Sequence, residues 1–314
     1  MNFIQQAYKG QNDWWMYIVT LLAVFIATQM GSLPLGIVAL FKVGGDMDRF
    51  QESTQHYFTD IGLNSNFYLF MMLLPFIFGL PVLILCIKKL HKKKITEVIT
   101  SRKKIDWHRI FYGAGLWAVV SCVMITLGII AFPDYFIWNF KPIPFLILVV
   151  VSILFIPLQT SFEEIIFRGY LMQGIGMLIK NNWVPLFLTA ILFGLLHAAN
   201  PEIEKIGYIA LVFYIGTGFL FGIITLMDEG TELAMGMHAV NNIVAALFVT
   251  TDWTVFQTDA LYIDISEPSA GWELFFPVLV VYPIIIIVFS KKYGWTNWKE
   301  KLFGKIENPI IIEE

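Results

Sequence analysis

Long runs of apolar residues alternate with short polar segments along this chain. The runs have the length of about 17 to 25 residues that a helix needs to cross roughly 30 Å of hydrocarbon. The predicted spans are 14–41, 67–87, 110–132, 144–160, 183–199, 206–227, 233–249 and 274–289. The pattern predicts an all-α fold, a polytopic membrane helix bundle with about eight transmembrane helices, in which 1–314 is a single membrane domain. The fourth helix is expected to continue past Thr160.

The composition supports a membrane location and excludes several classes of protein. Hydrophobic residues make up 57% of the chain and charged residues 14%, which excludes an ordinary water-soluble enzyme. The net charge of -3 argues against nucleic acid as a partner. Cys86 and Cys122 both lie inside apolar runs, so the sequence predicts neither a disulfide framework nor a cysteine metal site.

Basic residues are distributed unevenly between the two ends of the predicted bundle. The loop after the second span carries nine Lys and Arg, and the tail after the eighth carries five. With Lys9 and Lys180 this makes sixteen on one face, against four on the other, which are Lys42, Arg49, Lys141 and Lys205. Since cytoplasmic loops carry excess Lys and Arg, both termini are expected to be cytoplasmic. The expected location of this multi-pass protein is the plasma (inner) membrane of a bacterium, and the charge pattern fits an endoplasmic reticulum orientation equally well. The polar segment 95–108 is expected to lie on the cytoplasmic surface, facing the membrane lipid.

A few ionisable residues lie within or beside the predicted spans, where each costs several kcal/mol and marks a functional site by default. In SFEEIIFRGYL, Glu164 and Arg168 are one helical turn apart, which predicts an ion pair. Glu163 points about 100° away from Glu164, so one carboxylate can anchor the helix while the other stays free. For Glu164 and Arg168 alone, a purely structural ion pair is the simpler interpretation.

Two further polar elements lie on later spans. In FGLLHAAN, His197 follows Phe193 by one turn, and in GMHAVNN, His238 and Asn242 share a helix face. A carboxylate, a histidine and a His/Asn pair are the groups needed to activate a water molecule and to stabilise an oxyanion. Taken singly, each histidine is more often a hydrogen-bonded core residue, and Asn242 is expected to bond a neighbouring helix. The combination favours a site, while His56, His91 and His108 are assigned no chemistry.

The three motifs resemble those of a known family. EEIIFR as EExxxR, FGLLH as FxxxH and HAVNN as HxxxN follow one another on successive spans, as in the CPBP family of intramembrane proteases. That family includes the type II CAAX prenyl proteases and bacterial proteins linked to bacteriocin processing and self-immunity. The resemblance covers residues 144–250, the expected catalytic core. It implies an intramembrane endopeptidase whose substrate is a protein or peptide in or near the bilayer.

The resemblance also implies roles for the motif residues. Glu163 is the expected catalytic carboxylate, His197 holds the same water, and His238 with Asn242 stabilises the oxyanion, with Glu164 and Arg168 in support. No cofactor is required by this arrangement. A zinc-dependent version stays open, in which Glu163, His197 and His238 are the metal ligands. The HExxH zinc helix does not occur in the sequence, and the glutamate-activated water is favoured.

Three expectations complete the interpretation of the sequence. The reaction is expected in a polar cavity that opens toward the cytoplasmic half of the bilayer. One alternative is a non-proteolytic immunity or scaffold protein of the same fold, in which the motif residues matter only for folding. The other is a proton-coupled transporter, which predicts inverted internal repeats that the sequence does not show.

Overall fold

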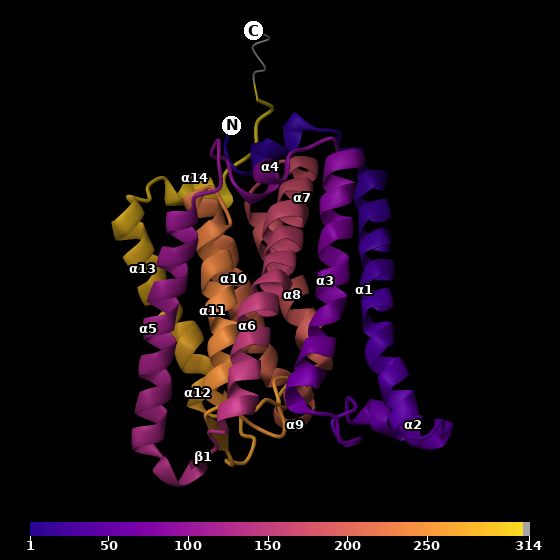
Figure 1. Cartoon of the computed structure of the whole chain (residues 1–314). Helices are drawn as coiled ribbons and strands as arrows, with labels where there is room; N and C mark the ends of the chain where they lie inside the picture. Colours follow the sequence, from indigo (N-terminus) through magenta and orange to yellow (C-terminus); the bar gives the residue numbers. More distant parts are fainter. Residues whose placement is uncertain (310–314) are drawn as a thin grey trace.

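The computed structural model describes residues 1–309, which form a bundle of helices that run mainly along one direction (Figure 1). The longer helices are α1 (Trp14–Lys42), α3 (Ser65–Lys89), α5 (Trp107–Ala131), α6 (Pro142–Glu164), α8 (Trp183–Leu196), α10 (Leu211–Asp228), α11 (Glu232–Phe248) and α13 (Tyr282–Tyr293). The shorter ones are α2 (Met47–Gln55), α4 (Ile95–Ile99), α7 (Met172–Ile179), α9 (Pro201–Ile206), α12 (Trp272–Phe276) and α14 (Trp298–Phe303). The all-α fold expected from the sequence is confirmed.

Among residues 1–309, six helical runs are long and apolar enough to cross a membrane. They are Trp14–Lys42, Ser65–Lys89, Trp107–Ala131, Pro142–Ile179, Tyr208–Asp228 and Trp272–Tyr293. Trp183–Ala199 is a shorter apolar helix, and α11 has 17 residues. The expected number of eight spans is therefore not confirmed, because the predicted segments 183–199 and 233–249 are not among these six runs.

The fourth helical run is much longer than its apolar core. It begins as α6 at Pro142, passes through a π-helical segment (η3, Ile165–Leu171) and continues as α7 to Ile179, a run of 38 residues. The predicted continuation past Thr160 is confirmed. Glu163 consequently lies near the middle of the run, about 30 Å from its start at about 1.5 Å per residue.

The helices pack in close pairs because small residues occur where their backbones approach. α5 packs on α11, α1 on α3, and α8 on α10, while α6 lies between α3 and α11. A Cβ atom on Gly236 of α11 would lie 2.0 Å from the carbonyl oxygen of Ile110 on α5, and one on Gly218 would lie 2.7 Å from that of Ala190 on α8. These contacts show why glycine is needed at both crossings.

The two ends of the bundle differ in what they carry. The N-terminus and the C-terminal end of the described chain, at residue 309, lie at one end (top of Figure 1), where Gln5 donates to the carbonyl of Glu307 at 3.0 Å. The opposite end carries α2, α9, α12 and a small sheet with the strand order β1-β3-β2. Its strands are β1 (Phe136–Trp138), β2 (Val249–Thr250) and β3 (Tyr262–Asp264), with β3 antiparallel to β1 and parallel to β2.

The segment 95–108 does not simply lie on the surface, as the sequence had suggested. Its helix α4 turns two side chains inward, so Val98 and Ile99 are 1% and 4% exposed. Lys103 and Lys104 remain exposed. His91, just before this segment, is also buried and bonds the hydroxyl of Tyr170 at 2.7 Å. The loop that the charge pattern predicted to be cytoplasmic is thus partly buried against the helix ends, because its apolar residues pack into the core.

Candidate functional site

The three polar motifs of the sequence meet at one cavity of about 500 Å³. Glu163 reaches it from α6, His197 from the turn η4 (His197–Ala199) after α8, and His238 and Asn242 from α11. Residues more than 30 positions apart in the sequence therefore share one cavity wall. The π-helical segment η3 begins directly after Glu164, which is a local irregularity that is common at functional sites.

Glu163 has one occupied and one open carboxylate oxygen. Its Oε1 accepts a hydrogen bond from Nε2 of Gln159 at 2.7 Å. Its Oε2 has no hydrogen-bond partner among the described residues and lies 3.6 Å from Nε2 of His238. The side chain is 10% exposed, the residue lines the cavity, and Oε2 itself is buried. A carboxylate oxygen left unpaired in a largely buried place is costly unless a water molecule or a substrate meets it.

Glu164 faces the other way and is fully buried with Arg168. Its Oε1 accepts from Nη1 of Arg168 at 2.9 Å and from Nδ1 of His238 at 2.8 Å. The guanidinium of Arg168 also lies 4.1 Å from the ring centroid of Phe193, a cation–π contact. The ion pair predicted from the one-turn spacing is confirmed, and it joins α6 to α11 through His238.

The two histidines are each oriented by a hydrogen bond through Nδ1. For His238 the partner is the Glu164 carboxylate, and for His197 it is the carbonyl oxygen of Phe193 at 2.8 Å. Because both partners only accept, Nδ1 carries the hydrogen in both rings, and Nε2 is left for other contacts. The predicted packing of Phe193 beside His197 is also confirmed, with ring centroids 4.8 Å apart.

The structure adds Gln159, which the sequence interpretation missed. Its amide donates to Glu163 and accepts from Nδ2 of Asn242 at 3.1 Å, so it joins two of the motifs. Asn242 in turn accepts from Asn241 at 3.0 Å, and Asn241 accepts from the indole of Trp117 at 3.0 Å. A polar side chain one turn before Glu163 in an apolar helix was the signal available in the sequence.

Tyr214 and Glu202 form a second group that the sequence did not indicate. The ring of Tyr214 stacks on His197 with centroids 4.2 Å apart and an interplanar angle of 19°. Its hydroxyl donates to Glu202, which also accepts from the backbone N–H of Val255 at 3.2 Å. Tyr214 lies on α10 and Val255 lies in the loop after β2, so no local sequence pattern predicts that they lie close together. The position of His197 is thereby linked to the loop that borders the cavity.

A metal site with three protein ligands does not emerge from this arrangement. Within residues 1–309, no three His, Cys, Asp or Glu side chains stand close enough together to hold a metal ion. Glu163 and His238 approach each other, but His197 does not complete a group of three with them. The residues as placed do not fit the zinc alternative, and no step of the chemistry below passes through a metal.

The cavity occupies the half of the bundle that lies away from the termini. On α3 its lining runs from Tyr68 to Phe76, in the first half of that helix, and on α11 it runs from His238 to the last turns. The loop after β2 completes the lining at the far end. The sequence had predicted cytoplasmic termini together with a cavity that opens toward the cytoplasm. Those two expectations cannot both be correct, because the helices carry the cavity and the termini at opposite ends.

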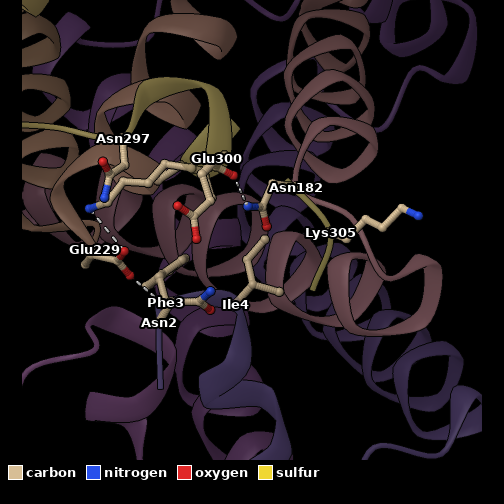
Figure 2. Close-up of a pocket in the computed structure, with 10 residues that line it drawn as sticks. Asn2, Phe3, Ile4, Asn182, Glu229, Asn297, Glu300 and Lys305 are labelled. Carbon is tan, nitrogen blue, oxygen red and sulfur yellow. Dashed lines mark hydrogen bonds and ion pairs between the residues drawn. The ribbon is translucent and has the colours of Figure 1, made fainter. Parts of the chain in front are cut away.

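A second cavity, of about 130 Å³, lies at the end that carries the termini (Figure 2). Here Glu229 accepts from the backbone N–H of Phe3 and pairs with Lys301 at 3.1 Å, while Asn182 donates to the carbonyl of Glu300 at 3.1 Å. None of the motif residues lines this cavity. Its polar groups join the two terminal segments to the bundle.

Fold and site together define the class: a multi-pass α-helical membrane protein with a polar, partly enclosed cavity bordered by carboxylate and imidazole groups. Comparison with known proteins is consistent with that class. Residues 142–244 match the family model of type II CAAX prenyl endopeptidase Rce1-like proteins. This match confirms the resemblance found in the motifs, over residues 142–244. The match supports a peptidase activity.

The chain is also similar to a protein of Bacillus subtilis (strain 168) that bears the name Uncharacterized protein YyaK. The two sequences are 28% identical over 298 residues, which cover 93% of this chain and 97% of the relative. The similarity therefore extends well beyond residues 142–244, into the helices that surround the site.

Proposed function

We propose that this protein is an intramembrane endopeptidase that hydrolyses a peptide bond of a membrane-associated protein or peptide with water activated by Glu163. The observation that supports it most directly is the open Oε2 of Glu163 at a cavity shared with His197, His238 and Asn242. The catalytic role of each residue follows from which of its hydrogen-bonding atoms are not already bonded to another residue.

Glu163 is the general base in this proposal. A water molecule in the cavity donates one hydrogen to Oε2 of Glu163 and the other to Nε2 of His197, which is a free acceptor once Nδ1 bonds Phe193. Glu163 takes the proton as the water oxygen attacks the carbonyl carbon of the peptide. The same proton then passes to the amide nitrogen, and the C–N bond breaks to give a carboxylic acid and an amine.

His238 and Asn242 stabilise the oxyanion that forms in the first step. Asn242 has two amide hydrogens, of which one is used by Gln159. Nε2 of His238 donates to the oxyanion when the ring carries both hydrogens. Removal of a single oxyanion donor commonly costs about 10²–10³ in rate.

The test is cleavage of membrane-tethered and short hydrophobic peptides by the purified protein. Glu163→Gln should lower kcat by about 10²–10⁴, the usual contribution of general acid–base catalysis, and should leave the protein folded because the amide keeps the side-chain shape. The matched control is Glu300→Gln, an exposed carboxylate at the end with the termini, which should cleave normally.

Three outcomes would count against this proposal. Cleavage that a zinc chelator abolishes and zinc restores would favour the metal-dependent version with Glu163, His197 and His238 as ligands. Cleavage that survives Glu163→Gln would remove the proposed base. A biological activity that needs no cleavage and is indifferent to Glu163 would point to the scaffold alternative.

A further inference from the structure

The orientation of the cavity limits which substrates can reach it. The helices line the cavity mainly from the half that lies away from the termini, while Glu163 of α6 and His238 of α11 lie near the middle of the bundle. α10 contributes Phe213, Tyr214 and Thr217, all within two turns of its start. α11 contributes residues from His238 onward to Ala245, and β2 contributes Val249. The loop that follows, with Thr254, forms the outer wall. The cavity thus extends from the middle of the bundle to the end that carries α9 and the small sheet (Figure 1).

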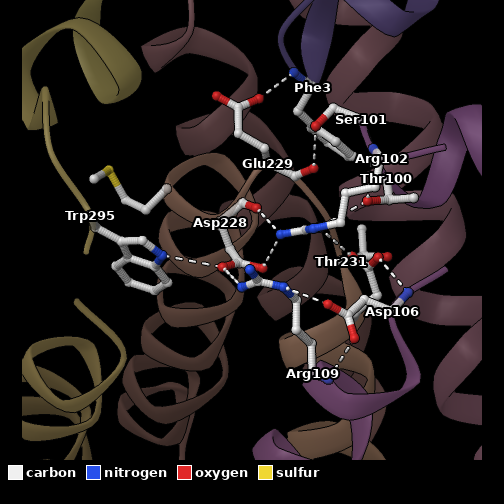
Figure 3. Close-up of polar contacts among 12 residues, drawn as sticks. Phe3, Thr100, Ser101, Arg102, Asp106, Arg109, Asp228, Glu229, Thr231 and Trp295 are labelled. Carbon is white, nitrogen blue, oxygen red and sulfur yellow. Dashed lines mark hydrogen bonds and ion pairs between the residues drawn. The ribbon is translucent and has the colours of Figure 1, made fainter. Parts of the chain in front are cut away.

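The other end of the bundle is closed above the site. Glu164 and Arg168 are both 0% exposed, and they fill the space directly beyond Glu163. Further along, Arg102 pairs with Asp228 at 2.8 Å and with Glu232 at 3.1 Å, across the ends of α10 and α11 (Figure 3). Between these two layers, the α11 side chains Leu233, Ala234 and Met237 are at most 1% exposed. Within residues 1–309, a polypeptide therefore finds no lined route to Glu163 from the end with the termini.

The charge distribution identifies which end faces the cytoplasm. Sixteen of the 21 Lys and Arg lie at the end with the termini, and four lie at the end where the cavity emerges. Those four are Lys42, Arg49, Lys141 and Lys205. So strong a bias in short loops predicts that the basic end is cytoplasmic. The cavity then opens on the opposite side.

We infer that the active-site cavity is entered from the extracytoplasmic side, and that the substrate is an exported or membrane-anchored polypeptide whose scissile bond lies on that side. This inference rests on the proposed function where it names a substrate. The side from which the cavity is entered does not depend on the proposed function. A protein prenylated at its C-terminus in the cytosol is excluded as a substrate, because its cleavage site never reaches this side of the membrane.

The cavity walls add a requirement on the substrate sequence. The α3 wall is apolar, with Leu69, Met72 and Phe76, whereas the opposite wall carries the amides of Asn241 and Asn242. An extended segment lying between them has apolar side chains on one face and its peptide groups toward the amides. The substrate class is thus an extracytoplasmic segment with apolar residues beside the cleaved bond.

Cysteine labelling in intact cells tests the direction of access. In a background with Cys86→Ala and Cys122→Ala, single cysteines are placed at Thr254→Cys on the outer wall and at Ala245→Cys deeper on α11, both lining the cavity. A small, charged thiol reagent that does not cross membranes should label both fully before permeabilisation. Ala246→Cys is the matched control, because Ala246 is the next residue on α11 and is 0% exposed; it should stay unlabelled.

A second control reports on the opposite end. Lys104→Cys, at an exposed position of the basic loop, should react only after permeabilisation. Labelling of Lys104→Cys in intact cells would invert the orientation and overturn the inference. So would an Ala245→Cys that reacts only after permeabilisation, or not at all. The labelling is repeated with Glu163→Gln and needs no cleavage, so a failure of the proposed enzyme leaves this result intact, and a failure of access leaves the cleavage assay intact.

Discussion

This protein buries two clusters of charge, one at the end with the termini and one in the middle of the bundle. In the end cluster, Arg102 and Arg109 meet Asp228 and Glu232, and the indole of Trp295 also donates to Asp228 at 3.2 Å (Figure 3). All four oxygens of the two carboxylates accept hydrogen bonds. This cluster closes the ends of three helices, α5, α10 and α11.

The middle cluster is less completely satisfied. Oε2 of Glu163, Oε2 of Glu164 and Nε of Arg168 have no hydrogen-bond partner among the described residues. Of these, only the open oxygen of Glu163 belongs to a residue that lines the large cavity. Buried charge alone therefore does not identify a functional site. A complete hydrogen-bond shell indicates a structural role, and an open atom beside a cavity indicates a chemical one.

The largest expected effect comes from breaking the complete cluster. Arg102→Met leaves Asp228 and Glu232 short of a countercharge and should lower the free energy of unfolding by about 3–5 kcal/mol, the usual cost of an uncompensated buried charge. The measurement is a denaturant titration of the purified protein in detergent micelles. Lys104→Met, an exposed basic residue two positions along, is the control and should be neutral. Equal stability of both variants would show that the cluster is not structural.

Lys93 is a buried cation with no carboxylate at hydrogen-bond distance among residues 1–309, unlike the arginines of the end cluster. Nζ of Lys93 donates to Oε1 of Gln173 at 2.8 Å, and burial lowers the pKa of Lys93 to about 8, against about 10.4 for an exposed lysine. At pH values between these two, Lys93 is protonated more often in the unfolded chain than in the folded one. The free energy of unfolding should therefore rise as the pH rises from about 8 to about 10.4. Lys93→Met should remove that rise and increase stability at pH 7 by at most about 3 kcal/mol. Unfolding titrations at several pH values would measure it, and an unchanged pH slope would contradict it.

The smallest expected effect concerns the open side of the middle cluster. Gln159→Leu removes the bonds to Glu163 and Asn242 and should cost about 1–3 kcal/mol of transition-state stabilisation, or roughly 5- to 150-fold in kcat. The matched control is Thr160→Val on the same helix, where the buried hydroxyl bonds only carbonyls of its own helix. If both variants cleave equally well, Gln159 does not position the base.

The sequence determined the features that follow from local composition. Apolar run length predicted an all-α membrane bundle, which the structure confirms with six long apolar helices rather than eight. One-turn spacing predicted the ion pair of Glu164 with Arg168 and the packing of Phe193 on His197, and the structure confirms both. The cost of charge in a membrane is a property of each residue in its own segment, so the motif residues stood out without knowledge of the fold.

Tertiary structure decided what lies next to what. The bond from Gln159 to Asn242 and the stack of Tyr214 on His197 join different helices, and their partners have no fixed sequence spacing. The depth of Glu163 depended on a helix that continues through a π-helical segment to Ile179, well past its apolar core. The end at which the cavity emerges was likewise invisible in the sequence, because it depends on how the halves of several helices pack together rather than on the composition of any one of them.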